Sequence, residues 1–396
     1  MQHFKCKLIA VVSTAIIIPP LYAEQYDTSR QDRLSKEHTK NQVVMPRVDI
    51  IGVPENMEYI SGSANVLNKK TLEQSRVFTV NEALRKVPGI HARDEEGLGL
   101  RPNIGIRGLN PTRSTKINLL EDGIPLAYAP YGDNASYYHP PIERFDHIEI
   151  LKGADQIRFG PQTIGGVINY ITPAPPQKFG GHIQVIGGNR DYFNGKVQLG
   201  GKGLLLDFMH KQADGARENI HSEVRDYNLK YVMGLTDSQA LTLRANYYTE
   251  DSQLTYSGLT TAEFNTFGAR YNPFKNDKFN SGRLGLSATH DLFFTNNLML
   301  TTNLYFARFD RDWWRASSTT TDIQCGNDFT TARNNGQAID VNACGTQGRL
   351  REYYSWGVEP RLRLNHNTLG VDSNLDFGFR AHFETQDRHQ VNLNQF

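Results

Sequence analysis

The chain has 396 residues, and its 43 basic and 42 acidic residues leave a formal net charge of +1. No overall field therefore directs it to nucleic acid or to another strongly charged partner. Only 38% of the residues are hydrophobic, which is too few for a helical membrane protein. The 34 glycines, 18 tyrosines and 20 phenylalanines favour β-structure with many turns.

Residues 1–23 have the pattern of a secretory signal peptide. Lys5 and Lys7 precede an apolar stretch at residues 8–18, and a cleavage site follows Ala23. The alternative is a membrane anchor, but a spanning helix needs about 20 apolar residues, and this stretch has roughly eleven. We therefore expect export and removal of this segment.

Residues 24–59 are expected to form a flexible segment, because most of them are polar, mixed in charge and without periodicity. The segment contains one apolar run, Val48-Asp49-Ile50-Ile51-Gly52. This run could add as a strand to the sheet edge of a partner protein. It could equally be the first strand of the domain that follows, and the local sequence leaves both interpretations open.

Residues 60–175 have the pattern of a small α/β domain. The run from Thr79 to Glu82 is a capping box ahead of a short helix, which Pro88-Gly89 ends. A tight turn is expected at Asp122-Gly123. Short apolar strands are expected around residues 104–106, 116–120, 148–152 and 167–171.

Residues 176–396 change to long strands in which apolar and polar side chains alternate, most clearly at 371–384. A soluble sandwich also alternates, but it rarely lines one face with so many charges. Such strands predict an antiparallel transmembrane β-barrel with lipid outside, water inside, short periplasmic turns and long external loops. Nine strands are predicted, at 182–187, 192–200, 203–212, 226–235, 240–249, 281–292, 298–309, 351–364 and 371–384. Long polar links are predicted at 213–225, 250–280 and 310–350.

Nine strands do not close a barrel of this kind, which uses an even number of strands. An open edge that faced lipid would leave its backbone groups unpaired. We therefore expect the N-terminal part of an incomplete barrel, whose ninth strand runs outward.

Two cysteines remain once the signal peptide is removed, Cys325 and Cys344. Both lie in a polar stretch rich in Thr, Asn, Asp and Gly. In an exported protein this arrangement predicts a disulfide that clips one external loop, and two free thiols are the alternative.

Three segments resemble the plug of TonB-dependent outer-membrane receptors: residues 104–108 (IGIRG), 120–125 (LEDGIP) and 148–172 (IEILKGADQIRFGPQTIGGVINYIT). Within that family, residues 105–111, 122–132 and 158–172 look most like ferric citrate receptors. The family closes its barrel with about 22 strands, so the resemblance implies an α/β plug domain followed by an incomplete antiparallel transmembrane β-barrel. Residues 24–47 are too short for the extra signalling domain that some ferric citrate receptors carry.

The resemblance implies a receptor in the outer membrane of a Gram-negative bacterium that imports a ferric chelate. TonB, with its energising inner-membrane complex, would pull on the N-terminal segment and rearrange the plug. Val48, Asp49, Ile50, Ile51 and Gly52 are the candidate TonB box, although they depart from the usual acidic start. Iron is expected only as chelated substrate, with no cofactor and no protein metal site. Outer-membrane lipid is the other expected partner, and nucleic acid is not.

A ferric citrate complex is anionic, so its site should present arginine, whose planar fork binds carboxylates through two hydrogen bonds. The resemblance places Arg107, in the IRG motif, toward the ligand. Strand parity points Arg351 and Arg311 into the lumen, with Arg308 as the alternative to Arg311. For each of them the competing interpretation is a solvated or salt-bridged lumen charge.

Three consecutive acids, Asp94-Glu95-Glu96, are expected in an apical loop of the plug, where they would repel a citrate complex. Either they pair with the arginines of the barrel, or the substrate is a different metal chelate.

Rival functions are a receptor for another chelate or nutrient, a passive porin, and a barrel enzyme. The plug motifs weigh against a porin. No paired carboxylates, His-Ser-Asp order or GxSxG turn indicates an enzyme, and no catalytic residue is expected.

Overall fold

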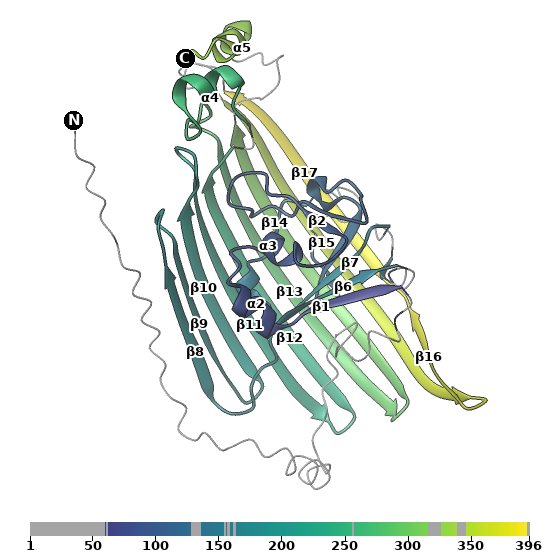
Figure 1. The fold of residues 1–396 in the computed structure, drawn as a ribbon. Helices are drawn as coiled ribbons and strands as arrows, with labels where there is room; N and C mark the ends of the chain where they lie inside the picture. The colour runs from purple at the N-terminus through teal and green to yellow at the C-terminus, as the bar shows by residue number, and fades with distance from the viewer. Residues whose placement is uncertain are drawn as a thin grey trace.

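The computed structural model describes residues 60, 62–127, 136–153, 156, 159–160, 164–255, 257–315, 326–338 and 346–393. Two bodies are visible, a small mixed domain and a large, tilted antiparallel sheet behind it (Figure 1). The five candidate TonB-box residues and both cysteines of the expected disulfide lie outside the described residues. Their predicted roles stay predictions.

The small domain is built on a five-stranded sheet. Its strands lie in the order β1 (Ser63–Leu67), β6 (His147–Lys152), β7 (Gly166–Ile171), β4 (Ile117–Glu121) and β5 (Ile124–Pro125). Only the β4 and β7 pair is parallel. A separate hairpin pairs β2 (Ile90–Ala92) with β3 (Ile104–Ile106), and the helical segments are α2 (Lys69–Ser75), α3 (Val80–Leu84), η2 (Thr112–Ser114) and η3 (Ile142–Arg144).

Local sequence explains several of these elements. Thr79 caps α3 by accepting a hydrogen bond from the Glu82 N–H, as the sequence predicts. The Glu82 carboxylate, however, accepts from the Phe78 N–H, one residue before the expected partner (2.6 Å). Asp122 and Gly123 have φ values of 47° and 79°, the two positive values that a tight hairpin turn requires. A Cβ at Gly105 would clash with the carbonyl oxygen of Leu109, which explains the glycine in the IGIRG motif.

The large sheet has ten antiparallel strands, which cover the nine predicted ones. The strands are β8 (Gly180–Gly187), β9 (Phe193–Gly201), β10 (Leu204–Asp214), β11 (His221–Thr236), β12 (Gln239–Gln253), β13 (Lys278–Thr295), β14 (Leu298–Arg315) and β15 (Thr346–Thr368), followed by β16 (Val371–Gly378) and β17 (Ala381–Leu393). The ninth predicted strand is therefore two strands, which pair with different halves of β15. The strands are longer than predicted: β10, β12 and β14 end at Asp214, Gln253 and Arg315, and β11, β13 and β15 begin at His221, Lys278 and Thr346.

The two faces of the large sheet differ as the alternation predicts. One face exposes apolar side chains such as Leu206, Tyr247 and Trp356, which are 43%, 49% and 50% exposed. The other face buries polar and charged side chains, among them Asp226 and Glu250, against the small domain. No helix among the described residues is long and apolar enough to cross a membrane. An apolar outer face with a charged inner face is the pattern of a barrel wall.

Candidate ligand-binding site

Four arginines share the inner face of β14 and β15, near the ends that carry the long loops. On β14, Arg311 and Arg315 are 2% and 6% exposed. Arg311 lies opposite Arg351 of β15 in the register, and Trp313 lies opposite Arg349. Because side chains alternate along a strand, these residues must point the same way as the buried Phe309 and Tyr353. The inward direction predicted for Arg311 and Arg351 agrees with this register.

Tyr137 of the plug brings the plug into contact with this wall. The guanidinium carbon of Arg311 lies 4.0 Å from the Tyr137 ring centroid, and that of Arg113 lies 4.4 Å from it. The Ser136 N–H donates to the carbonyl of Arg113 (2.9 Å), which holds Tyr137 next to Arg113. The Arg113 N–H donates to Asn103 (2.8 Å), which fixes the turn itself. The ring thus joins one plug arginine and one barrel arginine through cation–π contacts.

An aromatic and aliphatic patch supports the arginines from the side. Trp313 meets Tyr137 edge-on with ring centroids 5.8 Å apart, and it meets Phe279 at 6.0 Å. Phe279 and Trp313 form a buried cluster with Leu254, at the base of the loop after β12. The Arg315 guanidinium lies 5.0 Å from the Trp313 ring. Packed rings hold the guanidinium planes in fixed orientations.

Arg311 keeps hydrogen-bond donors that nothing in the described part of the chain satisfies. Its Nε and Nη1 are buried without an acceptor among the described residues, and the Nε of Arg349 is in the same state. Leaving a buried charged donor unpaired costs more than about 1–3 kcal/mol, so native proteins rarely tolerate it without an ion, water or ligand nearby. The arrangement suits an anion with planar carboxylates.

The three acids of the plug loop do not pair with the barrel arginines as one of the expectations had it. Asp94 pairs with Arg85 (2.7 Å), and Glu95 pairs with Arg113, so both use arginines of the plug itself. Glu96 is 3% exposed and accepts a hydrogen bond from the Leu100 N–H. Burial raises the pKa of Glu96, and the nearby Arg101 only partly opposes this. Two of the acids are thus neutralised by plug arginines, and the charge of the third is disfavoured.

Arg101 links the plug to the barrel wall at the level of Arg311, because Glu250 and Arg311 are both opposite Ser281 in the register. Its Nη1 donates to the Oε2 of Glu250 on β12 (2.9 Å), and its guanidinium lies 3.9 Å from the Phe279 ring centroid. Burial by itself would lower the pKa of Arg101, but the ion pair with Glu250 outweighs burial and raises it. The side chains of this pair are 4% and 1% exposed. Arg101 therefore has a structural partner and is not available to a ligand.

The other predicted site residues lie apart from the cluster. Arg107 is exposed and donates to the carbonyl of Lys152 (2.9 Å), and none of the contacts described above involves it. Arg308 lies on the outer face of β14, where it pairs with Glu352 (2.5 Å). We therefore leave Arg308 out of the site. Sequence parity could have added Arg315 and Arg349, but no sequence signal marks Tyr137.

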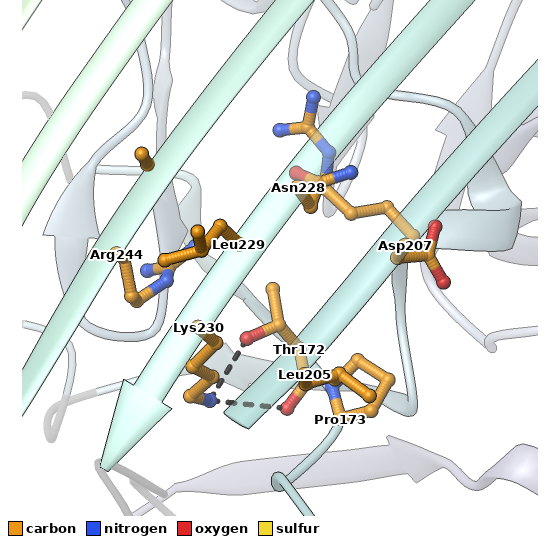
Figure 2. A pocket seen from close by; sticks show the side chains of 10 residues that line it. Thr172, Pro173, Leu205, Asp207, Asn228, Leu229, Lys230 and Arg244 are labelled. Atoms are coloured by element: carbon orange, nitrogen blue, oxygen red, sulfur yellow. Dashed lines mark hydrogen bonds between the residues drawn. The ribbon is translucent and has the colours of Figure 1, made fainter. Parts of the chain in front are cut away.

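A second charged region joins the plug to the wall along β11 and β12. Arg144 of η3 donates to Asp226 of β11 (2.9 Å) and to Glu121 of the plug (2.7 Å). Figure 2 shows Lys230 of β11 turned toward Thr172, to whose Oγ1 it donates (2.9 Å). Arg144, Thr172 and Lys230 border a cavity of about 20 Å³, room for about one water molecule. An iron chelate does not fit there, so this region holds the plug in place.

One group of side chains in the described residues has the composition of a metal site. Asp191, Asp214 and His221 bring three ligand-type atoms within 4.8 Å of one another. They lie at the hairpin ends of β9 to β11, and both carboxylates are exposed. They take no part in the arginine cluster.

Residues 56–167 match the family model described as the TonB-dependent Receptor Plug Domain. The chain is 29% identical over 176 residues to the vitamin B12 transporter BtuB of Vibrio cholerae, which covers 43% of this chain and 26% of that protein. It is 25% identical over 182 residues to the BtuB of Vibrio vulnificus, which covers 46% of this chain and 27% of that protein. The chain thus spans about a quarter of the length of these curated relatives.

Solved structures share the fold over most of this chain. The unliganded ferric citrate transporter FecA superposes with a TM-score of 0.73 at 21% identity, over 87% of this chain and 50% of that one. The ferric preacinetobactin receptor BauA of Acinetobacter baumannii superposes with a TM-score of 0.67 at 15% identity, over 84% and 48%. The chain thus combines a domain that matches the plug-domain model with a partial antiparallel barrel that has the fold of these solved receptors.

Proposed function

We propose that this protein is a TonB-dependent receptor of the Gram-negative outer membrane that imports an anionic ferric chelate, with ferric citrate as the best candidate. The plug would close the lumen at rest, so the protein is a gated transporter and not a passive porin. TonB would engage the N-terminal segment at Val48 to Gly52 and supply the force. Iron passes through as chelated substrate, and the protein needs no cofactor of its own.

The observation that carries the proposal is the buried, partly unsatisfied guanidinium of Arg311, held against Tyr137 on a wall with three further arginines. A ligand carboxylate at this position would satisfy the Nε and Nη1 donors and offset the cost of burying them. Arg351, opposite Arg311 in the register, is a second proposed ligand residue. Arg107 stays a proposed contact on the strength of its motif alone.

The main rival is a receptor for another metal chelate or nutrient. The curated relatives are named vitamin B12 transporters, so a corrinoid is the specific alternative. Four clustered arginines favour a ligand with several negative charges, because a neutral ligand would leave the unsatisfied donors of Arg311 and Arg349 without an acceptor. The arrangement of this wall therefore favours the ferric chelate.

The test is a binding titration of the protein as its gene encodes it, with ferric citrate and, as a neutral comparison, cyanocobalamin. Arg311→Ala and Arg351→Ala should each weaken ferric citrate binding by about tenfold to a hundredfold, since a hydrogen bond to a charged group contributes roughly 1.5–3 kcal/mol. Arg351→Lys should recover only part of the loss, because a point charge cannot reproduce the two-pronged fork.

Arg308→Ala is the matched control, because it removes an arginine from the same strand but from the outer face. It should bind like the wild type. If the wild type binds cyanocobalamin and ignores ferric citrate, the proposed substrate is wrong while the receptor class stands.

A further inference from the structure

Two of the long loops meet at a pair of short helices, at the top of Figure 1. α4 (Thr261–Phe267) belongs to the loop after β12, and α5 (Gly326–Asn334) belongs to the loop after β14. The N-terminus of α4 is a full capping box: Thr260 Oγ1 accepts from the Glu263 N–H (3.1 Å), and Glu263 Oε2 accepts from the Thr260 N–H (2.8 Å). Glu263 is 1% exposed, although α4 is part of a loop between two strands.

Arg333 of α5 reaches across to this cap. Its Nε donates to Glu263 Oε1 (2.7 Å) and its Nη2 donates to Glu263 Oε2 (2.9 Å), the two-pronged geometry of a strong ion pair. The same Nη2 also donates to the carbonyl of Gly258 (2.8 Å), and Thr260 Oγ1 donates to the carbonyl of Arg333 (2.8 Å). One side chain therefore fixes the geometry of two loops that lie about 70 residues apart in the sequence.

A third loop is tied to the same rim. Arg217, in the loop after β10, donates to the carbonyls of Ser257 (2.7 Å) and Tyr271 (3.2 Å). The Glu218 N–H donates to the carbonyl of Arg270 (2.8 Å). Arginines that bind backbone carbonyls fix the path of a loop and not only the place of one side chain. We name the linked loops around Arg333, Glu263 and Arg217 the loop clip.

The loop after β12 connects the loop clip to the arginine site: the Asp277 N–H donates to the carbonyl of Phe274 (3.2 Å). The Arg333 guanidinium lies 4.8 Å from the ring of Phe274, which is 1% exposed. The base of this loop is closed by the Leu254 N–H, which donates to the carbonyl of Asp277 (3.2 Å). Leu254 in turn packs in the cluster that contains Phe279 and Trp313, the side wall of the arginine site.

We propose that Arg333, acting through Glu263, is a positioning residue that holds this side wall in place before a ligand arrives. This inference rests on the proposed function, because the wall belongs to the proposed ligand site. A wall that is already ordered spares the ligand the entropic cost of ordering side chains and loop on binding. Arg333 itself does not touch the ligand.

The first experiment reads the wall without any ligand. The sequence has three tryptophans, so Trp314→Phe with Trp356→Phe leaves Trp313 as the only reporter. Trp313 is 5% exposed, and acrylamide should quench its fluorescence weakly. Arg333→Ala should make this quenching markedly stronger, whereas Arg308→Ala, which breaks an ion pair on the outer face, should leave it unchanged. Unchanged quenching in Arg333→Ala would overturn the proposal.

The second experiment titrates the same variants with ferric citrate. Arg333→Ala should weaken binding about tenfold, which corresponds to ordering roughly one or two side chains on association. Arg333→Lys keeps the charge but not the fork and should fall between alanine and wild type. Stronger quenching with unchanged affinity would show that the loop clip does not position the site. If Arg333→Ala does not fold, Glu263→Gln carries both measurements, because glutamine keeps a carbonyl acceptor for the helix cap.

The two proposals fail in different ways. If the wild type does not bind ferric citrate, the proposed substrate is wrong. The quenching measurement still decides whether Arg333 orders the wall. If the wild type binds ferric citrate and Arg333→Ala behaves like Arg308→Ala, the positioning role of the loop clip is wrong and the proposed function stands.

Discussion

Asp226→Asn should loosen the plug, because it removes a buried charge on which Arg144 depends. The side chains of Arg144 and Asp226 are each 1% exposed, and Arg144 donates to Asp226 and to Glu121. Breaking a buried ion pair by removing one partner costs about 3–5 kcal/mol. Glu121 remains beside the guanidinium and asparagine keeps one acceptor oxygen, so we expect the lower end, about 3 kcal/mol.

Amide hydrogen exchange in β4 and β7 measures this cost, because it reports the free energy of opening for each amide. A loss of about 3 kcal/mol should speed the exchange more than a hundredfold. Asp251→Asn is the matched control: Asp251 is 61% exposed and pairs with Lys278 at 3.5 Å. Its loss should change the opening free energy by less than about 0.5 kcal/mol.

A double-mutant cycle tests the reasoning itself. Once Arg144→Met has removed the cation, Asp226→Asn should cost much less, with a coupling energy of about 2–3 kcal/mol. If the two changes add within about 0.5 kcal/mol, or if Asp226→Asn behaves like Asp251→Asn, the buried pair does not hold the plug and the argument is refuted.

Three further predictions concern charge and covalent structure. Burial raises the pKa of Asp122, but Arg244 and the other cation beside it outweigh burial and hold the pKa at about 2, below the usual 3.8. Asp122 should therefore contribute about 2 kcal/mol of stability above pH 4, which is lost as the pH falls from 4 toward 2; an equally steep acid loss in Asp122→Asn would contradict this. Burial raises the pKa of Glu96, so its charge destabilises the plug at neutral pH; Glu96→Gln should raise the melting temperature at pH 7 and not below about pH 4. Cys325 and Cys344 should be joined, stabilising their loop by about 3 kcal/mol at most, and peptide mass spectrometry without reductant should find no free thiol.

Much of the barrel wall could be predicted because successive side chains of a strand point to opposite faces, so the sequence alternates with a period of two residues. The alternation located the ten strands of the large sheet, with β16 and β17 predicted as one, and the inward direction of Arg311 and Arg351. The strands were predicted too short, because the polar residues next to the long loops still pair across the sheet. The bend at Phe379 splits the ninth predicted strand, but the alternation of apolar and polar residues continues through it, so the sequence did not predict the bend.

The plug was predicted less completely. Its glycine motifs and the Thr79 cap are local signals, and they led to α3, β3, β4, β6 and β7. The edge strand β1 and the helix α2 were missed, because neither carries a strong alternating or amphipathic pattern. β1 is a strand only because it pairs with β6, some 85 residues later in the chain.

The sequence by itself thus determined which segments form strands, which face of each strand is apolar, and where glycine and capping residues force a turn. These features depend on residues within a few positions of one another. The tertiary structure decided which charges meet: Arg101 finds Glu250 across 149 residues, and Glu95 is paired with Arg113 of the plug and not with a barrel arginine. It also placed Tyr137, which no pattern marks, against Arg311. Such contacts form only when the plug packs against the wall. They join residues that are far apart in the sequence, so a pattern among neighbouring residues cannot predict them.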